Sequence, residues 1–313
     1  MHTTTLKPAG RSTAQMARDV ISLFKLRIGV LIMITALVGM AVTPGPAPSF
    51  VQALVLAISV LMASASAGAF NQYVEFESDR LMRRTSRRAF ATGALPHHPA
   101  WLVLMAVLLA VAVASAWLVL NAVAALHVFL GAFFYGVVYT LWLKRRTAMN
   151  IVIGGLAGSF AVLAGAAAVD PGLGPLPWLL ALVLFLWTPP HFWSLAIANS
   201  ADYAQAGVPM LPVVVGPERA ARTVLLSTIA LFLASLAPLA FGAGWVYGAG
   251  ALVGGLHFVR KSWQLARKPE RATAMGSFFA SLVQLSLLLV AASIDALMRL
   301  NGKPRHGLPE FAS

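Results

Sequence analysis

The most informative stretch of the sequence is NQYVEFESDRLMRRTSRR at residues 71–88, which follows a long uninterrupted apolar run. Asn71, Glu75 and Asp79 are spaced four residues apart, so a continuing helix would place all three on one face, within about 80° of arc. Two of the arginines that follow extend the same row. The stretch therefore predicts a membrane helix that ends in an acidic cluster and is followed by a cluster of guanidinium groups.

An acidic cluster at the mouth of a membrane helix, followed by arginines, suits an Mg2+-bound diphosphate. Hard carboxylate and amide oxygens hold the metal, and the forked guanidinium groups bind phosphate oxygens. A structural interpretation is equally open. In that interpretation the acids only mark a helix end, and the arginines form a solvated loop that orients the chain in the bilayer.

The composition is that of an all-α integral membrane protein. Of the 313 residues 59% are hydrophobic and only 11% are charged, and the mean hydropathy is +0.80. Soluble domains carry roughly 25% charged residues. The net charge of +13 lies mainly in short loops between apolar runs, so we predict a lipid bilayer and no nucleic acid as the partner. The absence of cysteine excludes a disulfide, a thiolate metal site and a cysteine nucleophile.

The apolar runs predict a bundle of nine transmembrane helices. Nearly all of the 23 lysines and arginines fall before the first span or in the loops after every second span, which places the amino terminus in the cytoplasm. Arg299, Lys303 and Arg305 would lie on the opposite side, which is the one conflict with nine spans. The predicted spans lie at about residues 21–43, 50–70, 100–120, 122–143, 149–169, 177–198, 222–243, 245–260 and 274–298.

The predicted organisation is a single membrane domain at residues 19–299, between a polar cytoplasmic tail at 1–18 and a polar tail at 300–313. Residues 1–18 lack the apolar core and the cleavage site of a signal peptide. No soluble domain is expected beside the membrane domain.

The sixth span contains the run WTPPHFW at residues 187–193, which places two prolines and a histidine inside an apolar segment. The prolines are expected to kink the helix and to free carbonyl groups that need partners within the bundle. Ionisable groups at that depth are costly unless they are used, so His191 is a candidate site residue, with packing as the alternative. Trp187 and Trp193 flank the prolines with broad apolar faces.

Other polar residues lie at the ends of the spans. Lys144 and Arg145 form a short basic loop, and a solvated loop that orients the chain is the stronger interpretation of both. Asp202 lies eleven residues after the histidine of the sixth span, so one helix could carry both toward the same mouth. His127 and His257 are interpreted as packing residues. The glycines of the fifth span are expected to allow close helix packing.

Taken together, these motifs resemble the protoheme IX farnesyltransferases, or haem O synthases, a family of the UbiA-type intramembrane prenyltransferases. The resemblance extends over about residues 20–298. The runs TPPHFW and AGVPMLP together distinguish the haem branch from the quinone branch. The motifs lie, in chain order, at residues 71–79, 82–85, 139–145, 150–155, 187–193 and 202–213.

The resemblance implies a nine-helix bundle of UbiA type whose cytoplasmic mouth holds Mg2+ and a prenyl diphosphate between two polar motifs. The second motif departs from the family pattern, because residues 198–201 read ANSA where relatives carry a further acid and basic residues. A similar departure is Ala89, where a proline is common. The candidate site residues are Asn71, Glu75, Asp79 and Asp202 as catalytic residues, the three acids among them as Mg2+ ligands, Arg83, Arg84, Arg88, Lys144 and Arg145 for the diphosphate, and His191, Trp187 and Trp193 for haem.

The reaction that the resemblance implies joins farnesyl diphosphate to protoheme IX. A haem vinyl group attacks the allylic carbon as diphosphate leaves, and water then adds to give a hydroxyethylfarnesyl substituent. The implied location is a bacterial inner membrane, with haem A synthase or a terminal oxidase as assembly partners.

Two other classes of function are weighed against this one. A quinone-type aromatic prenyltransferase would share the Mg2+ motif, but the TPPHFW run argues against it. A transporter would also have kinked helices and buried polar groups, but its acids are expected near the bilayer midplane. Here the acids collect at one mouth.

Overall fold

The computed structural model describes residues 12–302, and all of its regular elements are helices. Residues 1–11 and 303–313, which contain most of the two predicted tails, lie outside the described residues. The predicted boundary at residue 18 falls inside the first helix. The elements are α1 (Thr13–Leu23), α2 (Leu26–Val42), α3 (Phe50–Val74), α4 (Phe76–Leu81), α5 (Ala100–Val119), α6 (Ala122–Phe133), η1 (Phe134–Leu143), α7 (Asn150–Gly154), α8 (Leu156–Ala167), α9 (Pro175–Ala198), α10 (Ser200–Gln205), α11 (Leu211–Val215), α12 (Pro217–Leu236), η2 (Ala237–Phe241), α13 (Trp245–Arg267) and α14 (Arg271–Gly302).

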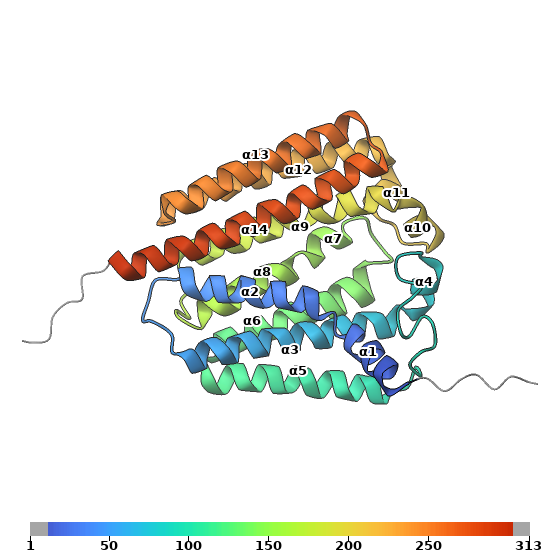
Figure 1. Ribbon diagram of the computed structural model, residues 1–313, viewed down its shortest axis with the longest axis horizontal. Coiled ribbons are helices and arrows are strands. Elements are labelled where there is room, and N and C mark those ends of the chain that lie inside the picture. Colours follow the sequence, from blue (N-terminus) through green and yellow to red (C-terminus); the bar gives the residue numbers. More distant parts are fainter. Residues whose placement is uncertain (1–11, 303–313) are drawn as a thin grey trace, which may run out of the picture.

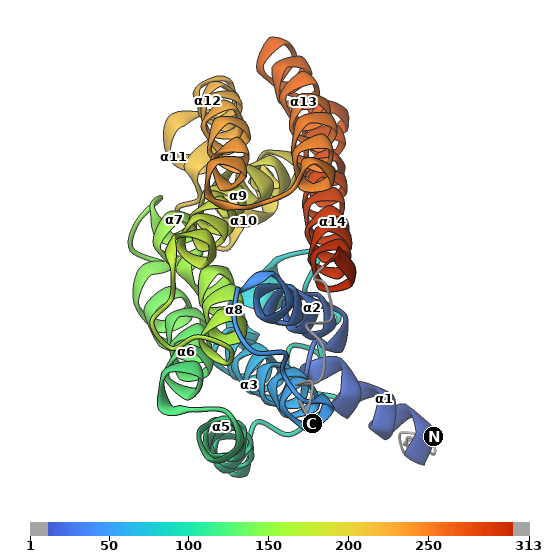
Figure 2. The same cartoon turned by 90° about the vertical axis from the view of Figure 1, so that its left-hand side faces the viewer.

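The long helices run alternately up and down, and each packs against the next long helix along the chain (Figure 1). The series α2, α3, α5, α6, α8, α9, α12, α13 and α14 closes into a ring because α14 also packs against α2. Contacts of α2 with α8 and of α9 with α14 cross the ring. Figure 2 shows these helices end-on. All loops that follow α3, α9 and α13 therefore lie at one end of the bundle, which we call the mouth.

The all-α membrane fold is confirmed, but the count of nine spans is not. Among the described residues, seven helices are long and apolar enough to cross a bilayer, or eight if the bent pair of α1 and α2 forms one span. The predicted eighth span is present as α13, but it is not among these seven. Its sequence explains the difference, because its last turns contain Arg260, Lys261 and Arg267.

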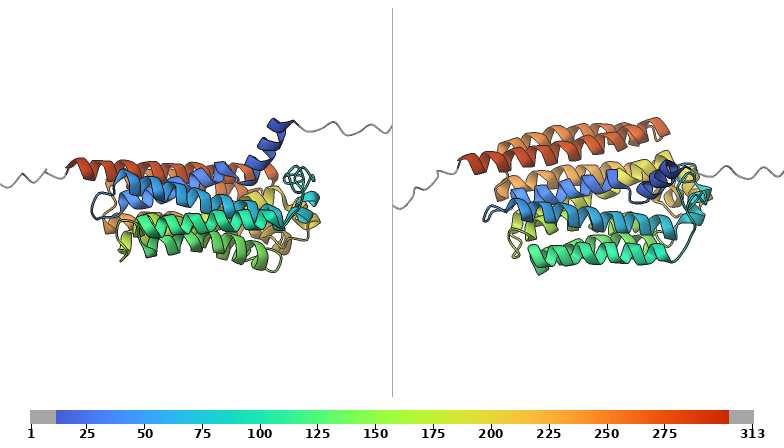
Figure 3. Two further views of the ribbon diagram at one scale, coloured as in Figure 1. Left: turned by 90° about the horizontal axis from the view of Figure 1, so that it is seen from below. Right: turned by 60° about the horizontal axis from the view of Figure 1, so that its bottom comes forward.

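The predicted first span is not one continuous helix. It breaks between α1 and α2, which are bent by 41°. Lys25 lies at the break with φ 45° and ψ 42°, a left-handed conformation that is uncommon for a residue with a Cβ atom. Figure 3 shows α1 standing away from the bundle at this point. The break turns the side chain of Lys25 into the bundle, where it meets α3.

A close contact between α2 and α8 explains one of the glycines of the fifth span. A Cβ atom on Gly165 would lie 1.8 Å from the Ala36 carbonyl oxygen, so no other residue fits there without separating the two helices. Gly158 makes no such contact, since nothing lies within 4 Å of its added Cβ. Close packing is therefore confirmed at Gly165 and is not the reason for Gly158.

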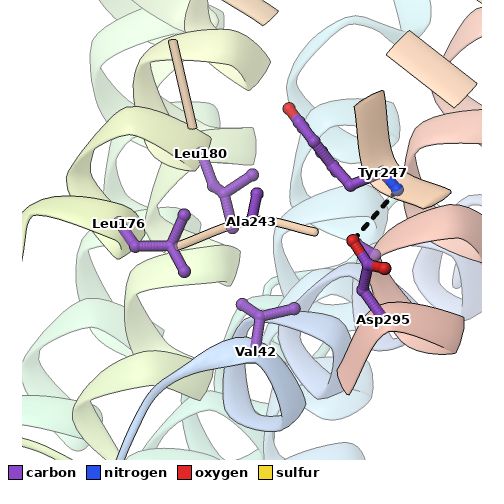
Figure 4. A pocket seen from close by; sticks show the side chains of 7 residues that line it. Val42, Leu176, Leu180, Ala243, Tyr247 and Asp295 are labelled. Atoms are coloured by element: carbon purple, nitrogen blue, oxygen red, sulfur yellow. Dashed lines mark hydrogen bonds between the residues drawn. The ribbon is translucent and has the colours of Figure 1, made fainter. Parts of the chain in front are cut away.

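At the end of the bundle opposite the mouth, a narrow cavity is lined mostly by apolar side chains of α2, α9, α13 and α14, among them Val42, Leu180 and Tyr247 (Figure 4). Asp295 of α14 borders the cavity and is 4% exposed. Its Oδ2 atom accepts a hydrogen bond from the backbone N–H of Tyr247 at 3.0 Å. Because Tyr247 is in the first turn of α13, Asp295 caps that helix from a neighbouring one.

Candidate active site

The three polar residues of the first motif come together at the mouth, as the four-residue spacing predicts. α3 ends at Val74 and α4 begins at Phe76, but the backbone hydrogen bonds from Glu75 to Asn71 and from Asp79 to Glu75 keep the helical spacing across the junction. Asn71, Glu75 and Asp79 are 3%, 2% and 0% exposed. These are buried polar groups, not an acidic helix end in solvent.

Glu75 is held by two side chains. Its Oε2 atom accepts a hydrogen bond from Asn71 Nδ2 at 2.7 Å and from Lys144 Nζ at 2.5 Å. Lys144 is also buried, with 8% exposed. The predicted alternative of a solvated loop therefore does not hold for Lys144. The cation and the hydrogen-bond donor offset the loss of hydration of this buried side chain.

Asp79 has its own cation. The Nη1 atom of Arg88 donates to both carboxylate oxygens of Asp79, at 2.9 and 2.7 Å. Arg88 comes from the turn-rich segment that follows α4, and this segment is fastened to α4 by a hydrogen bond from the Thr85 hydroxyl to the Asp79 carbonyl at 3.1 Å. The two acids thus form two separate ion pairs, with partners that approach from different parts of the chain.

A third cation, Lys25, lies in the same cluster but is not paired with a carboxylate. Its Nζ atom donates to Asn71 Oδ1 at 2.6 Å and to the Tyr135 hydroxyl at 3.3 Å. It forms no salt bridge within residues 12–302. The mouth therefore gathers three cations, Lys25, Arg88 and Lys144, and two carboxylates. We call these five residues, together with Asn71, the mouth cluster.

A π-helix brings the fourth span to the mouth cluster. Residues Phe134–Leu143 form η1, in which hydrogen bonds join residues five apart, as between the Lys144 N–H and the Tyr139 carbonyl. The wider turn places Tyr135, Thr140 and Lys144 against α3, where Thr140 Oγ1 accepts from Asn71 Nδ2 at 3.2 Å. π-Helical segments are rare and occur often at functional sites. η1 is thus the element that delivers Lys144 to Glu75.

The second motif lies at the same end but is not joined to the mouth cluster. Asp202 is in the short helix α10, is partly exposed, and makes no side-chain hydrogen bond or salt bridge to a described residue. The next residue, Tyr203, is buried in one apolar cluster with Met82, which directly follows α4. The two motifs are therefore neighbours, with Asp202 toward solvent. Arg83, Arg84 and Arg145 are also exposed.

The histidine of the sixth span is buried between α9 and α14. His191 is 7% exposed, and its ring stacks on Trp187 at 4.2 Å between centroids and on Phe278 at 4.6 Å. α9 continues as one helix through Pro189 and Pro190. Trp193 does not join this group, because it packs in the apolar cluster around Tyr203. Of the three candidates for a haem contact, the structure brings together two.

The donor atoms at the mouth fit Mg2+ when the substrate supplies further ligands. Mg2+ is usually held by one or two carboxylates together with phosphate oxygens and water, rather than by a complete cage of protein groups. Glu75 and Asp79 are hard oxygen donors of this kind. No group of three or more acidic, histidine or cysteine side chains suited to a metal occurs in the described part of the chain. A metal here would therefore depend on the oxygens of a bound substrate.

Sequence comparison defines the class of protein. The model of the UbiA prenyltransferase family matches residues 32–283. The chain belongs to the UbiA prenyltransferase family, and with its long apolar helices it is a multi-pass membrane protein.

The fold agrees with solved structures. A structure from work on digeranylgeranylglyceryl phosphate synthase matches with a TM-score of 0.75 at 17% identity, over 90% of this chain and 99% of that one. A UbiA homologue from Archaeoglobus fulgidus bound to DMAPP and Mg2+ matches with a TM-score of 0.66 at 16% identity, over 87% of this chain and 99% of that one.

Closer relatives define a branch within the family. Protoheme IX farnesyltransferase 2 of Paramagnetospirillum magneticum is 56% identical over 277 residues, covering 88% of this chain and 96% of that protein. Protoheme IX farnesyltransferase 1 of the same organism is 50% identical, covering 89% and 98%. Protoheme IX farnesyltransferase of Granulibacter bethesdensis is 37% identical, covering 89% of this chain and 90% of that protein. The resemblance noted in the sequence is thereby confirmed.

The sequence analysis missed two members of the site. Lys25 was counted with the charges that orient the chain, although it lies inside an apolar run, where an ionisable residue is itself a signal of function. Ser281, which contacts His191, was not recognised because a serine in a membrane helix usually bonds its own backbone. Only the fold brings it to the histidine.

Proposed function

We propose that this protein transfers a farnesyl group from farnesyl diphosphate to a vinyl group of protoheme IX, giving haem O and diphosphate. The observation that carries the proposal is the charge of the mouth cluster, in which Lys25 is a third cation beside two acids that already have partners. A partly buried cation without a counter-ion favours the binding of an anion. The names of the close relatives supply the two substrates.

The cluster suggests how the diphosphate binds. Lys144 and Arg88 each hold an acid through a side chain that can turn to a phosphate oxygen, and this exchange frees Glu75 and Asp79 for a metal. Bound Mg2+ would neutralise the leaving diphosphate and so ease cleavage of the allylic C–O bond. Asp202 is our proposed third oxygen ligand, since α10 lies beside the first motif. Lys25, held by Asn71, is a further group for the phosphate oxygens.

The rest of the reaction uses the apolar interior below the mouth. An allylic cation is quickly lost to water, so the farnesyl chain needs a lining without polar groups. Below the mouth cluster, the buried side chains of the helices are mostly apolar. Ala36, Met40 and Val60, for example, belong to one buried hydrophobic cluster. Trp187 and His191 on α9 are the proposed contacts for the porphyrin.

The experiment is direct. Purified protein in detergent is incubated with haem B, farnesyl diphosphate and Mg2+, and the haem is analysed by mass spectrometry. The expected product carries a hydroxyethylfarnesyl group, and its formation requires Mg2+. Prenylation of an aromatic quinone precursor with haem B left unchanged would overturn the proposal in favour of the quinone branch.

We further propose a bacterial inner membrane with the mouth and the amino terminus in the cytoplasm. The basic loops at the mouth support this orientation, because such loops stay cytoplasmic. A membrane-impermeant reagent should reach single cysteines placed at Arg84 and Arg145 only from the cytoplasmic side. A cysteine at Gly172, in the loop between α8 and α9, should react only from the other side. Labelling of all three from one side would contradict the orientation.

A further inference from the structure

A short turn joins η1 to α7 and carries Lys144 to the mouth cluster. The last carbonyl groups of a helix have no partner within that helix. At the end of η1, the Leu143 carbonyl accepts two backbone N–H groups of the turn, at 2.9 and 3.2 Å. The Lys144 carbonyl accepts instead from Nδ2 of Asn150 at 3.2 Å, which is its only hydrogen bond from a described residue. The side chain of Asn150 therefore caps the end of η1 at the residue that reaches Glu75.

The amide of Asn150 can face this turn in only one way. Its Nδ2 atom also donates to the Thr147 carbonyl at 2.7 Å, so both of its N–H groups are used. A carbonyl oxygen can only accept, so the amide oxygen cannot take the place of Nδ2. Asn150 is 0% exposed, and its Oδ1 atom is buried without a hydrogen-bond partner in the described part of the chain. A buried polar atom without a partner costs free energy, so packing alone would favour an apolar side chain here.

A glycine lets α7 approach η1 closely enough for this contact. A Cβ atom on Gly154 would lie 2.8 Å from Cδ2 of Tyr139, which belongs to η1. Carbon atoms in ordinary contact are about 3.5–4.0 Å apart, so a larger residue would push α7 away from η1. Residues 150–155, which read NIVIGG, thus form a unit that presses Asn150 against the end of η1.

The ammonium group of Lys144 depends on this backbone contact. A lysine has a flexible four-carbon stem, so its backbone and the groups around its ammonium determine where the charge lies. The Nζ atom lies 2.5 Å from Glu75 Oε2 and 5.7 Å from the centroid of the Tyr139 ring. In the proposed function this ammonium turns from Glu75 to a phosphate oxygen. The backbone hydrogen bonds of Lys144, to Tyr139 and from Asn150, then keep the residue in place.

We infer that Asn150 is a positioning residue for Lys144 in the binding of a diphosphate. The inference rests on the proposed function, which assigns Lys144 to that group. Asn150 acts through the Lys144 carbonyl and does not itself touch the diphosphate. By holding that carbonyl, it sets the place from which the ammonium group reaches an anion. The role requires the two N–H donors of the side chain and not only its volume.

The first test measures the position of Lys144 without any substrate. Full-length protein in detergent is treated with a small amine-reactive reagent, and the modification of each lysine is followed by mass spectrometry. Wild-type Lys144 is buried and paired with Glu75, so it should react slowly. In Asn150→Ala it should react about fivefold faster, as for one lost hydrogen bond. Asn150→Leu, which fills the space without a donor, should behave in the same way. Lys25 should keep its rate in both variants and so report that the mouth is still folded.

The second test measures binding of inorganic diphosphate with Mg2+, by calorimetry and without haem. Lys144→Met should weaken binding about tenfold, as for one lost hydrogen bond to a charged group. Asn150→Ala should also weaken it. The double variant should bind no more weakly than Lys144→Met alone, because a residue that acts only through Lys144 then has nothing to act on. Additive losses, or unchanged binding in both single variants, would overturn the inference.

Asn121→Ala is the matched control. Asn121 lies at the far end of the bundle, where its Nδ2 atom donates to the Ala167 carbonyl at 2.7 Å and its Oδ1 atom accepts from the Ala124 N–H at 2.9 Å. Its loss should lower the melting temperature and leave both the labelling of Lys144 and diphosphate binding as in wild type. Unchanged labelling of Lys144 in both Asn150 variants would overturn the inference, even if farnesylated haem is formed. If labelling and binding change as expected but haem B is not farnesylated, the proposed function fails and the positioning role stands.

Discussion

The two ends of the bundle both bury acids, but they hold them in different ways. At the mouth, Glu75 and Asp79 are paired with Lys144 and Arg88, which are side chains that can turn to another anion. At the far end, Asp295 accepts a hydrogen bond from a backbone N–H in the first turn of α13. A backbone donor cannot move without unwinding its helix. Burial of an acid therefore does not by itself indicate function.

The largest effect is expected at the acids of the mouth cluster. Glu75→Gln or Asp79→Asn should lower turnover about 100- to 1000-fold, because each removes a charge that we propose to act on the leaving diphosphate through Mg2+. The measurement is kcat for farnesylated haem, together with the amount of folded protein from size exclusion. Glu77→Gln is the matched control, since Glu77 lies in the same segment and is exposed. Parallel loss of folded protein and of activity would make these acids structural, like Asp295.

The next effect is expected at Lys25. Lys25→Met keeps an unbranched side chain of similar length and removes the charge, so kcat/KM for farnesyl diphosphate should fall about 10- to 100-fold, as for one lost hydrogen bond to a charged group. The melting temperature should change little, because Lys25 has no salt bridge to lose among the described residues. Arg27→Met is the control, two residues further on and exposed. An equal loss in both variants would show that only the total charge near the mouth matters.

Asp295 tests the other side of the comparison. Asp295→Ala should destabilise the protein by about 1–2 kcal/mol, the usual value for a lost helix cap. Thermal unfolding followed by tryptophan fluorescence should show a lower midpoint. Turnover per folded molecule should stay near that of wild type at a temperature well below the midpoint. Strong loss of turnover in folded Asp295→Ala protein would show that the far end takes part in the reaction.

The smallest effect is expected for an exposed charge at the mouth. Arg145 is adjacent to Lys144 in the chain but lies in solvent, so Arg145→Gln should change kcat/KM less than about threefold. The change should shrink further as salt is added, because exposed charges are screened. Steady-state rates at two ionic strengths measure both effects. A loss as large as that of Lys25→Met would bring Arg145 into the site.

Much of the fold and part of the site follow from the sequence. Periodicity and spacing predicted the long helices and the common face of Asn71, Glu75 and Asp79, because these are local properties of a helix. The break at Lys25 was not predicted, since LFKLR contains no proline or glycine and the partners of the Lys25 side chain lie far along the chain, in α3 and η1. The π-helix η1 was not predicted either, because its contacts to α3 join residues that are distant in the chain.

Partners that are distant in the chain could not be predicted. Asp79 is nine residues from Arg88, and this pair was within reach of sequence reasoning as part of one motif. Glu75 and Lys144 are 69 residues apart, and His191 and Ser281 are 90 apart. Such pairs depend on which helices become neighbours in the ring. The span predicted at residues 245–260 is present as α13, and the charges in the last turns of this helix lie toward the mouth.

The order of the helices around the ring has a consequence for how the protein is made. All six members of the mouth cluster lie between Lys25 and Lys144, in the first half of the chain, whereas the pair of His191 and Ser281 waits for the last helix. Chains emerge from the ribosome amino terminus first. A nascent chain can therefore assemble the proposed anion-binding cluster before the proposed contacts for the porphyrin are complete. Packing of the carboxyl-terminal helix α14 against α2 and α9 closes the ring and brings Ser281 to His191 in the same step.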